Sequence, residues 1–244
     1  MTRVLVISDI HANAVALDAV LKNAGKFDEA WCLGDVVGYG PQPNECIERI
    51  RSLPNLICIM GNHDFAANGE MTLDAFNSDA RKALLWQRKQ LSEQSRIFLK
   101  NLPKVMVVHG EASLVHGSPR DPIWEYVMNT LVARNNLSFF ATPWCLVGHS
   151  HFQAVFQFDS KMDDMSILVP HPEEVYGLKE RAILNPGSVG QPRDRDPRAA
   201  YAIFSPEIQT WETRRAEYDI KLVQKMILDA GLPSRHAERL SGGW

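Results

Sequence analysis

The first 60 residues repeat one hydropathy pattern, in which a short apolar run is followed by polar residues and then by an amphipathic segment. The apolar runs at residues 4–7, 30–33 and 56–60 predict three buried strands. Helices are predicted after the first two strands, from about Asn13 and from Pro43, because each segment has an N-terminal start signal and apolar positions at helical spacing. Successive strand–helix steps are typical of parallel strands joined by right-handed crossovers.

Beyond residue 70 the pattern changes twice. Residues 72–102 contain no Gly or Pro and predict one or two helices. A strand pair at 105–108 and 112–115, a helix at 124–137 and a buried strand at 144–147 are predicted next. Mostly antiparallel strands and a final helix are predicted after that. The strands are residues 152–158, 166–169, 181–184, 199–204 and 207–214, and the helix is residues 219–230.

Composition narrows the class of protein. With 244 residues, 45% of them apolar, the chain suffices for one domain with a sizeable core. Its 26 Lys and Arg against 29 Asp and Glu give a net charge of −3, so we expect neither a stable nucleic-acid partner nor a membrane partner. No apolar run approaches the roughly 18 to 20 residues that span a bilayer, and the N-terminus shows no secretory signal. Four isolated cysteines among apolar neighbours predict reduced thiols in a cytoplasmic protein.

Side chains that can bind metals follow five of the predicted strands. Carboxylate, imidazole and amide groups occur together there, where α/β sheets bind their ligands. Each pattern alone is weak, but five together indicate one shared site. Without a thiolate, the set suits Mn²⁺, Fe, Zn²⁺, Co²⁺ or Ni²⁺ and not a structural cysteine zinc site. The five stretches are Asp9-x-His11, Gly34-Asp35, Gly61-Asn62-His63-Asp64, His116-Gly117 and Gly148-His149-Ser150-His151.

These blocks, in this order, resemble those of the calcineurin-like metallophosphoesterase superfamily, and especially its small prokaryotic phosphodiesterase branch. The resemblance extends to residues 38–41, 115–119 and 185–190 and so covers most of the chain. It implies an α/β fold, a four-layer α/β/β/α sandwich of two mixed sheets. We expect one domain over residues 1–244, with a helical insertion at about residues 65–102.

The resemblance also implies a dinuclear metal site. Asp35 would bridge the two metals with one carboxylate oxygen. Two cations roughly 3.5 to 4 Å apart would lower the pKa of a bridging water and orient the hydroxide for in-line attack on phosphorus. We expect two divalent ions, with Mn²⁺ as first choice and Fe, Zn²⁺, Ni²⁺ or Co²⁺ as alternatives. The implied ligands of the first metal are Asp9, His11 and His151, and those of the second are Asn62, His116 and His149.

Three further residues are assigned to catalysis or substrate binding. By resemblance, His63 serves the phosphate, either as general acid to the leaving oxygen or as a cation on the transition state. Asp64 would fix the tautomer and orientation of His63. Arg193 lies in a charged loop for which a solvated position is the default, and a bidentate clamp on the substrate phosphate is the alternative.

Three other histidines are set aside. His109 has a Val-Val-His-Gly context like that of His116, but it falls in a predicted hairpin turn, so we prefer His116 as the ligand. His171 and His236 lack any such context and are expected to be surface residues.

The implied function is metal-dependent hydrolysis of a small phosphoester, with a phosphodiester preferred. A phosphomonoesterase and a dinucleoside-polyphosphate hydrolase are alternatives on the same site. An alternative of another class is a protein-binding scaffold on the metallophosphoesterase fold, which is disfavoured because every ligand position is filled. The sequence leaves open whether the chain forms a homo-oligomer.

Overall fold

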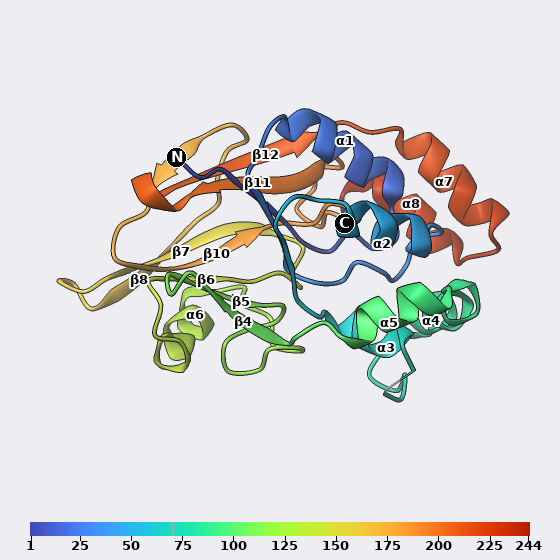
Figure 1. Cartoon of the computed structure of the whole chain (residues 1–244), viewed down its shortest axis with the longest axis horizontal. Helices are drawn as coiled ribbons and strands as arrows, with labels where there is room; N and C mark the ends of the chain where they lie inside the picture. The colour runs from blue at the N-terminus through green and yellow to red at the C-terminus, as the bar shows by residue number, and fades with distance from the viewer. Residues whose placement is uncertain (70) are drawn as a thin grey trace.

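Two mixed six-stranded sheets pack against each other, and helices cover both outer faces (Figure 1). This is seen in a computed structural model, which describes residues 1–69 and 71–244. The predicted four-layer α/β/β/α sandwich is confirmed.

The first sheet holds the three predicted N-terminal strands side by side. Across the sheet, the strands are β3 (Leu56–Cys58), β2 (Glu29–Cys32), β1 (Val4–Ile7), β11 (Ala199–Ser205), β12 (Thr210–Ala216) and β9 (Val175–Gly177). β1, β2 and β3 are parallel, as the strand–helix repeat predicts. β1 also pairs antiparallel with β11, so the C-terminal part of the chain completes this sheet.

The second sheet is built in the same way around three parallel strands. Across the sheet, the strands are β4 (Val105–Val108), β5 (Ala112–Val115), β6 (Trp144–Leu146), β10 (Arg181–Pro186), β7 (Gln153–Asp159) and β8 (Asp164–Leu168). β5, β6 and β10 are parallel, and the others pair antiparallel. The predicted hairpin of β4 and β5 is confirmed.

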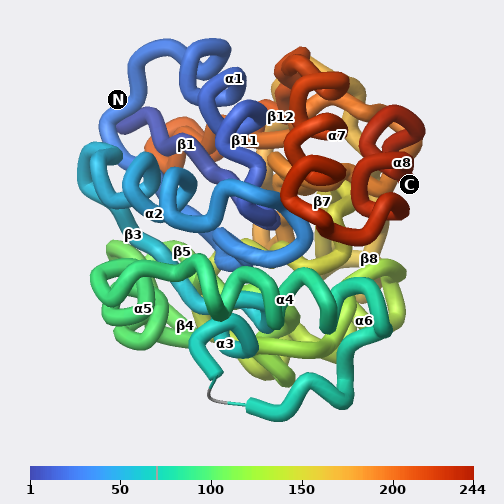
Figure 2. The backbone as a smooth tube through the Cα atoms, turned by 90° about the vertical axis from the view of Figure 1, so that its right-hand side faces the viewer, coloured from blue at the N-terminus to red at the C-terminus, as the bar shows by residue number. Residues whose placement is uncertain are grey.

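Eight α-helices lie within the described residues. They are α1 (Ala14–Ala24), α2 (Pro43–Arg51), α3 (Asn62–Ala67), α4 (Ser78–Gln90), α5 (Glu93–Lys100), α6 (Thr130–Asn136), α7 (Ile220–Asp229) and α8 (Ser234–Gly242). α1 begins after Asn13, whose side chain accepts a hydrogen bond from the Ala16 N–H, and it ends before Gly25. Figure 2 shows α3, α4 and α5 together on one side of the molecule, below α1, α2 and α7.

Apolar side chains fix how the layers pack. Trp31 of the first sheet and Leu184 of the second belong to one buried cluster between the sheets. Leu17 of α1 belongs to the cluster on the outer face of the first sheet, and Ala133 of α6 to the cluster on the outer face of the second. Fully burying a large apolar side chain contributes about 1.5 to 3 kcal/mol, so these clusters hold the two sheets in a fixed relation.

Two predicted elements have different bounds in the structure. The helix predicted at 124–137 begins only at α6, because Asn129 accepts a hydrogen bond from a backbone N–H of its first turn and caps it there. The strand predicted at 207–214 begins later, as β12, because Pro206–Ile208 forms a short 3₁₀ turn. A second 3₁₀ turn, Leu137–Phe139, follows α6.

Three elements were not predicted, and the first is α3, whose initial residues were interpreted as the polar end of the preceding strand. β9 is a three-residue edge strand, too short to carry a hydropathy pattern. α8 was missed because Gly231 was interpreted as the stop of the last helix, whereas a further helix begins after Pro233, which stands at its N-cap. The expectation that His236 is a surface residue is wrong, since α8 places it in the interior with 3% of its surface exposed. His171 is exposed, as predicted.

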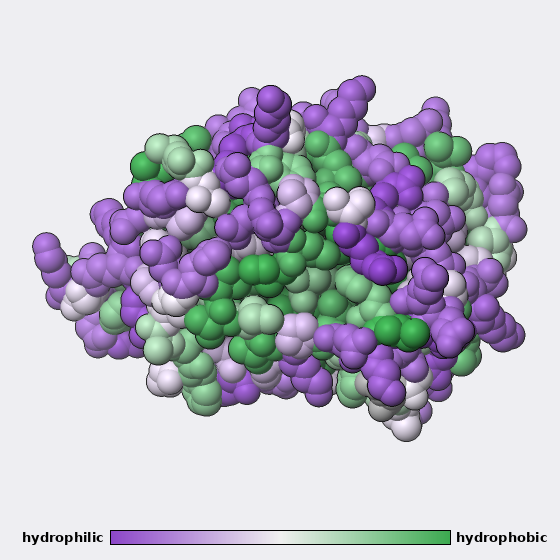
Figure 3. Space-filling view, in the orientation of Figure 1, coloured by the Kyte–Doolittle hydropathy of each residue, from purple (hydrophilic) through white to green (hydrophobic). Residues whose placement is uncertain are grey.

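Hydrophobic residues gather on one face of the molecule (Figure 3), and the four cysteines lie in its interior. Figure 3 shows hydrophobic residues gathered across the middle of one face, between the halves that carry the two sheets, with hydrophilic residues around them. No helix among the described residues is both long and apolar enough to cross a bilayer. All four cysteines are buried and free, which agrees with reduced core thiols.

Candidate active site

The carboxyl ends of β1, β2 and β3 carry the first group of site residues. Asp9 and His11 lie just beyond β1, Asp35 lies just beyond β2, and Asn62 begins α3 after β3. Because the three strands are parallel neighbours, these residues meet at one edge of the first sheet.

The second sheet supplies the remaining ligand candidates. His116 follows β5, and His149 and His151 follow the parallel neighbour β6. The structure thus brings all seven ligands assigned from the sequence to one place, and each is at most 4% exposed.

The backbone at these residues is held in an uncommon conformation. Asp9, His11, Asp35, His149 and His151 have φ angles between 51° and 63°, in the left-handed region. Such a conformation at a non-glycine residue costs about 1 to 3 kcal/mol and persists where the surrounding structure enforces it, often at functional sites. The fold therefore gives up some stability to hold these five side chains in their orientations.

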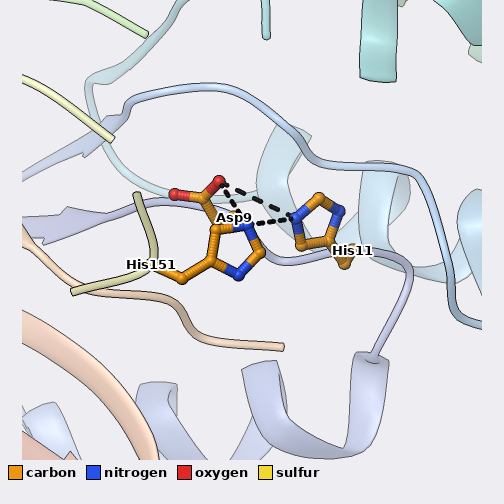
Figure 4. Close-up of side chains that lie close together, drawn as sticks. All are labelled: Asp9, His11 and His151. Atoms are coloured by element: carbon orange, nitrogen blue, oxygen red, sulfur yellow. Dashed lines mark hydrogen bonds and ion pairs between the residues drawn. The ribbon is translucent and has the colours of Figure 1, made fainter. Parts of the chain in front are cut away.

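Asp9, His11 and His151 form one cluster (Figure 4). His151 Nε2 lies 3.2 Å from Asp9 Oδ1 and 3.1 Å from His11 Nε2. His11 Nε2 lies 3.7 Å from the same Asp9 oxygen. Figure 4 shows the two imidazoles and the carboxylate pointing toward one another, as ligands of a common ion would.

Asp35, His116 and His149 form the second cluster. His116 Nε2 lies 3.4 Å from Asp35 Oδ2 and 3.1 Å from Asn62 Oδ1. Asp35 Oδ2 also lies 3.7 Å from His11 Nε2 in the first cluster. One carboxylate oxygen therefore faces both groups of ligands.

Two carboxylate oxygens show that this site suits cations. Asp9 Oδ1 and Asp35 Oδ2 are buried and have no hydrogen-bond partner among the described residues. The other oxygens are satisfied, since Asp35 Oδ1 accepts from the His63 N–H at 2.8 Å and Asp9 Oδ2 accepts from the Ser8 hydroxyl at 2.6 Å. A buried, uncompensated carboxylate is strongly unfavourable. The residues therefore fit two divalent cations, which the two clusters would hold with Asp35 between them.

Backbone carbonyls orient three of the imidazoles. In each, Nδ1 donates to a carbonyl oxygen, which leaves the lone pair on Nε2 directed into the clusters. The pairs are His11 Nδ1 with Val37 at 3.1 Å, His116 Nδ1 with Leu33 at 2.8 Å and His151 Nδ1 with Gln191 at 2.6 Å. Such outer contacts fix ligand geometry before any metal binds.

His149 is oriented the other way round. Its Nε2 lies 3.2 Å from the Trp124 carbonyl oxygen, which leaves Nδ1 for the second cluster. Its ring stacks on Tyr126 with centroids 3.9 Å apart. Trp124 and Tyr126 were not assigned to the site from the sequence, because their stretch was interpreted as part of a helix.

Burial and one ion pair set the charges of the site. Burial raises the pKa of Asp9 to about 6, and it lowers the pKa of His149 to about 3 and that of His11 far below its usual range. For His116, burial acts to lower the pKa, but the Asp35 carboxylate outweighs it and raises the pKa to about 10. Burial acts to raise the pKa of Asp35, but His116 and the other imidazoles hold it well below its usual range. Without metal, the second cluster therefore contains an imidazolium–carboxylate pair.

We expect metal binding to displace the proton of His116. A ligand imidazole must be neutral, whereas a pKa of about 10 keeps His116 protonated in the metal-free site. Calorimetric titration of metal-stripped protein with Mn²⁺ at about pH 8, in buffers of different ionisation enthalpy, should show about one proton released per protein. The apparent Mn²⁺ affinity should rise between about pH 6 and pH 8, because protons compete with the metal for His116 and for Asp9. A pH-independent affinity would contradict the assignment of His116 as a ligand.

The chain matches a protein family over most of its length. Residues 2–208 match the model of the calcineurin-like phosphoesterase superfamily domain. The chain belongs to this superfamily. It is also 39% identical over 245 residues to an uncharacterized protein of Methanocaldococcus jannaschii, a match that covers 97% of this chain and 96% of that protein.

Solved structures agree with the membership of this phosphoesterase in the family. A metallophosphoesterase from Sphaerobacter thermophilus is 46% identical, with a TM-score of 0.92 and coverage of 100% of this chain and 99% of that one. A hypothetical protein from Pyrococcus horikoshii is 22% identical, with a TM-score of 0.78 and the same coverages, and shares the fold.

The phosphoesterase uses one of its two similar His-Gly sequences at the site. His109 is 59% exposed and its Nε2 lies 3.2 Å from Glu29 Oε1. His116 is buried in the second cluster. The choice of His116 over His109 agrees with this geometry.

His63 lines the same cavity as the metal-ligand candidates. The cavity has a volume of about 100 Å³ and also touches Asp35, Asn62 and His149. The His63 ring packs against Tyr39, with centroids 4.4 Å apart. Burial lowers the pKa of His63 to about 4, so the ring is neutral near pH 7.

The predicted hydrogen bond from Asp64 to His63 is not formed. Asp64 Oδ1 accepts from the Val37 N–H at 3.0 Å and Oδ2 from the Gly61 N–H at 3.0 Å. His63 Nδ1 is buried and has no partner in the part of the chain that the structure describes. Asp64 is the third residue of α3, so its carboxylate reaches back to the start of its own helix. The prediction that Asp64 fixes the tautomer of His63 is therefore wrong. Asp64 instead joins the turns after β2 and β3.

Arg193 lies at the site, and not in a fully solvated loop. It lines the cavity that holds His63 and the metal-ligand candidates. Its Nη2 donates to Gln191 Oε1 at 3.0 Å and to the Tyr39 hydroxyl at 3.4 Å, while its buried Nε finds no hydrogen-bond partner in the described part of the chain. The position suits a phosphate oxygen as the missing acceptor.

Gln87 of α4 was missed by sequence reasoning, although it is fully buried beneath the site. It accepts from the Gly38 N–H at 2.7 Å and donates to the Gly40 carbonyl at 2.7 Å. Gly38 has a φ of 104°, and a Cβ there would collide with His63 Nδ1. Gln87 thus holds the loop against which His63 packs, and a lone Gln in a helix gives no local signal of such a role.

Replacing Gln87 with Leu should lower the free energy of unfolding by about 2 to 4 kcal/mol, because two buried backbone groups would each lose a partner at about 1 to 3 kcal/mol. Urea denaturation followed by circular dichroism measures this change. Gln90→Leu is the matched control on an exposed position of the same helix, and it should change the stability by less than about 0.5 kcal/mol. Equal effects of the two variants would contradict this role for Gln87.

Proposed function

We propose that this phosphoesterase hydrolyses small phosphodiesters with two divalent cations bound, Mn²⁺ being the first choice. The observation that carries the proposal is the buried Asp35 Oδ2, which faces both ligand clusters and accepts no hydrogen bond from the described residues. The preference for diesters is supported by the motifs that the chain shares with the small prokaryotic phosphodiesterase branch.

The two ligand clusters support the donor set proposed for these cations. When bound, two cations lower the pKa of a water between them and neutralise phosphate oxygens. Asp9, His11 and His151 would hold one cation, Asn62, His116 and His149 the other, and Asp35 both.

His63 is proposed to serve the leaving oxygen. Its Nδ1 faces Gly38, so Nε2 is the nitrogen left to face substrate. On the anionic substrate the ring would take up a second proton from solvent, pass the Nε2 proton to the leaving oxygen and return to its neutral form. Arg193, on the same cavity, would bind the non-bridging phosphate oxygens.

Two aromatic residues help to keep water from this step. Phe76 packs on His63 with ring centroids 4.9 Å apart and on Trp124 at 5.4 Å. Both line the cavity of the metal-ligand candidates. A drier cavity strengthens the interactions of His63 and Arg193 with the phosphate.

Assays of metal-stripped protein test the proposal. With Mn²⁺ restored, we expect hydrolysis of bis-p-nitrophenyl phosphate, and slower hydrolysis of p-nitrophenyl phosphate. Metal-dependent hydrolysis of neither compound would favour the scaffold alternative. A faster reaction with the monoester would overturn the diester preference.

A further inference from the structure

A second cavity, of about 310 Å³, adjoins the cavity of the metal-ligand candidates. The two cavities share Tyr39, Asn77, Tyr126 and Arg193 as lining residues. The first cavity, at about 100 Å³, is small for a whole substrate, since sites for small molecules are typically about 300 Å³ or larger. Any substrate group beyond the reacting phosphate therefore has this second cavity to enter.

Three arginines line the second cavity: Arg193, Arg235 and Arg239. The last two belong to α8, which lies beyond the residues 2–208 that match the family model. Figure 2 shows the C-terminal helices and α4 on the same side of the molecule, and the first residues of α4 complete the lining. The α8 part of this wall thus lies outside the residues that match the family model.

These three arginines have no carboxylate side chain as an ion-pair partner within residues 1–69 and 71–244. Arg198 and Arg215, in contrast, pair with Asp196 and Asp194. Instead, Arg193 and Arg239 both donate to one neutral acceptor, Gln191 Oε1, at 3.0 and 3.1 Å. Two guanidinium groups thus converge on one neutral oxygen.

Arg239 is the more constrained of the two guanidinium groups on α8. Its Nε donates to the backbone oxygen of Trp244. Burial, followed by repulsion from Arg193, lowers its pKa to about 10, which still leaves it charged near pH 7. A bound anion would relieve the repulsion that the pair now carries.

His236 supplies an independent observation. It lines the same cavity, is 97% buried, and neither of its ring nitrogens has a hydrogen-bond partner among the described residues. Buried polar nitrogens are rarely left unpaired. The cavity has one carboxylate in its lining, Asp79 in the first turn of α4, against three guanidinium groups.

We propose that this cavity, which we name the arginine pocket (Tyr39, Asn77, Ser78, Asp79, Tyr126, Arg193, Arg235, His236, Arg239), binds a second phosphate of the substrate. The inference rests on the proposed function, because it takes the first phosphate to react at the metal-ligand cavity. Arg193 borders both cavities and would contact both phosphates. The substrate class is then a phosphoester or phosphoanhydride with a further phosphate group near the reacting one.

A phosphate fits this pocket better than other groups. Its several oxygens can accept from more than one guanidinium, and Arg binds phosphate in bidentate geometry. A single carboxylate offers only two oxygens for the donors of Arg193, Arg235 and Arg239. The pocket therefore suits a second phosphate better than an uncharged or singly charged group.

Binding of inorganic pyrophosphate to metal-stripped protein, measured by isothermal titration calorimetry, tests the pocket without catalysis. We expect the double variant R235Q/R239Q to bind pyrophosphate about tenfold or more weakly than the unaltered protein. The control R49Q/R134Q removes two positive charges from ion pairs on other surfaces and should keep the affinity within about twofold. Thermal melting verifies that each variant is folded. If the double variant fails to fold, R235Q alone, at an exposed position, should bind about threefold more weakly.

Three results would overturn the proposal that the arginine pocket binds a phosphate. They are no binding by the unaltered protein, equal binding by R235Q/R239Q and the unaltered protein, and equal weakening in R235Q/R239Q and R49Q/R134Q. If the proposed function is wrong, the result is different, because the unaltered protein will show no Mn²⁺-dependent hydrolysis. The two failures are therefore distinguishable.

Discussion

Asp35→Asn should reduce kcat for bis-p-nitrophenyl phosphate by about 1,000-fold or more and lower the bound metal by at least about one ion per protein. The Asp35 carboxylate faces both clusters, with Oδ2 at 3.4 Å from His116 and 3.7 Å from His11. An amide in its place provides no negative charge between two cations. A loss of roughly 4 kcal/mol of transition-state stabilisation corresponds to this factor.

Steady-state kinetics and metal analysis of the same preparation measure both effects. Asp163→Asn is the matched control, since Asp163 is 74% exposed and pairs with Arg134 away from the clusters. It should leave the rate and the metal content unchanged. An Asp35→Asn protein that keeps two metals and most of its rate would remove the basis for a shared ligand.

His63→Ala should slow turnover by about 100- to 10,000-fold while both metals stay bound, as expected for the loss of a general acid. His63 lines the cavity of the metal-ligand candidates but is not one of the seven assigned ligands. His109→Ala serves as the control, because His109 is exposed and pairs with Glu29.

The neighbouring residue Asn62 should behave in the opposite way. Asn62→Ala removes an oxygen that lies 3.1 Å from His116 Nε2, so we expect weaker binding of the second metal. Added Mn²⁺ should recover a larger share of the rate in Asn62→Ala than in His63→Ala. If extra metal rescued His63→Ala instead, the roles of the two neighbours would have to be exchanged.

The candidate ligands could be predicted from the sequence because they occur in short local sequence patterns. Asp9 and His11, or His149 and His151, stand two residues apart directly after an apolar strand. Parallel pairing of the strands then brings such patterns together, and the hydropathy pattern predicts that pairing. Fold class and ligand candidates therefore depend on signals a few residues long.

The contacts that support the site residues could not be predicted from the sequence, because they join loops that are distant along the chain. Asp64 was assigned to its neighbour His63, but its oxygens bond to Val37 and Gly61. Gln87 reaches a loop nearly fifty residues earlier in the chain. Such contacts depend on where a helix packs, which no local pattern encodes.

The arginine pocket was missed for a different reason. Its α8 residues follow Gly231 and Pro233, and Gly231 was interpreted as the end of the last helix, although a proline such as Pro233 is common at helix starts. Once α8 was overlooked, His236 lost its structural context and was placed on the surface. A single misjudged boundary thus concealed both a buried histidine and two arginines.

The ligand candidates are divided between the two sheets, so metal binding depends on both sheets being folded and packed together. Asp9, His11, Asp35 and Asn62 follow strands of one sheet, and His116, His149 and His151 follow strands of the other. A folding intermediate with only one sheet formed would hold part of each ligand cluster and would bind the ions weakly. Cations bound in the finished molecule would link the two sheets without a covalent bond. Metal content would therefore report whether the two halves have docked, and its loss under mild stress would precede loss of either sheet.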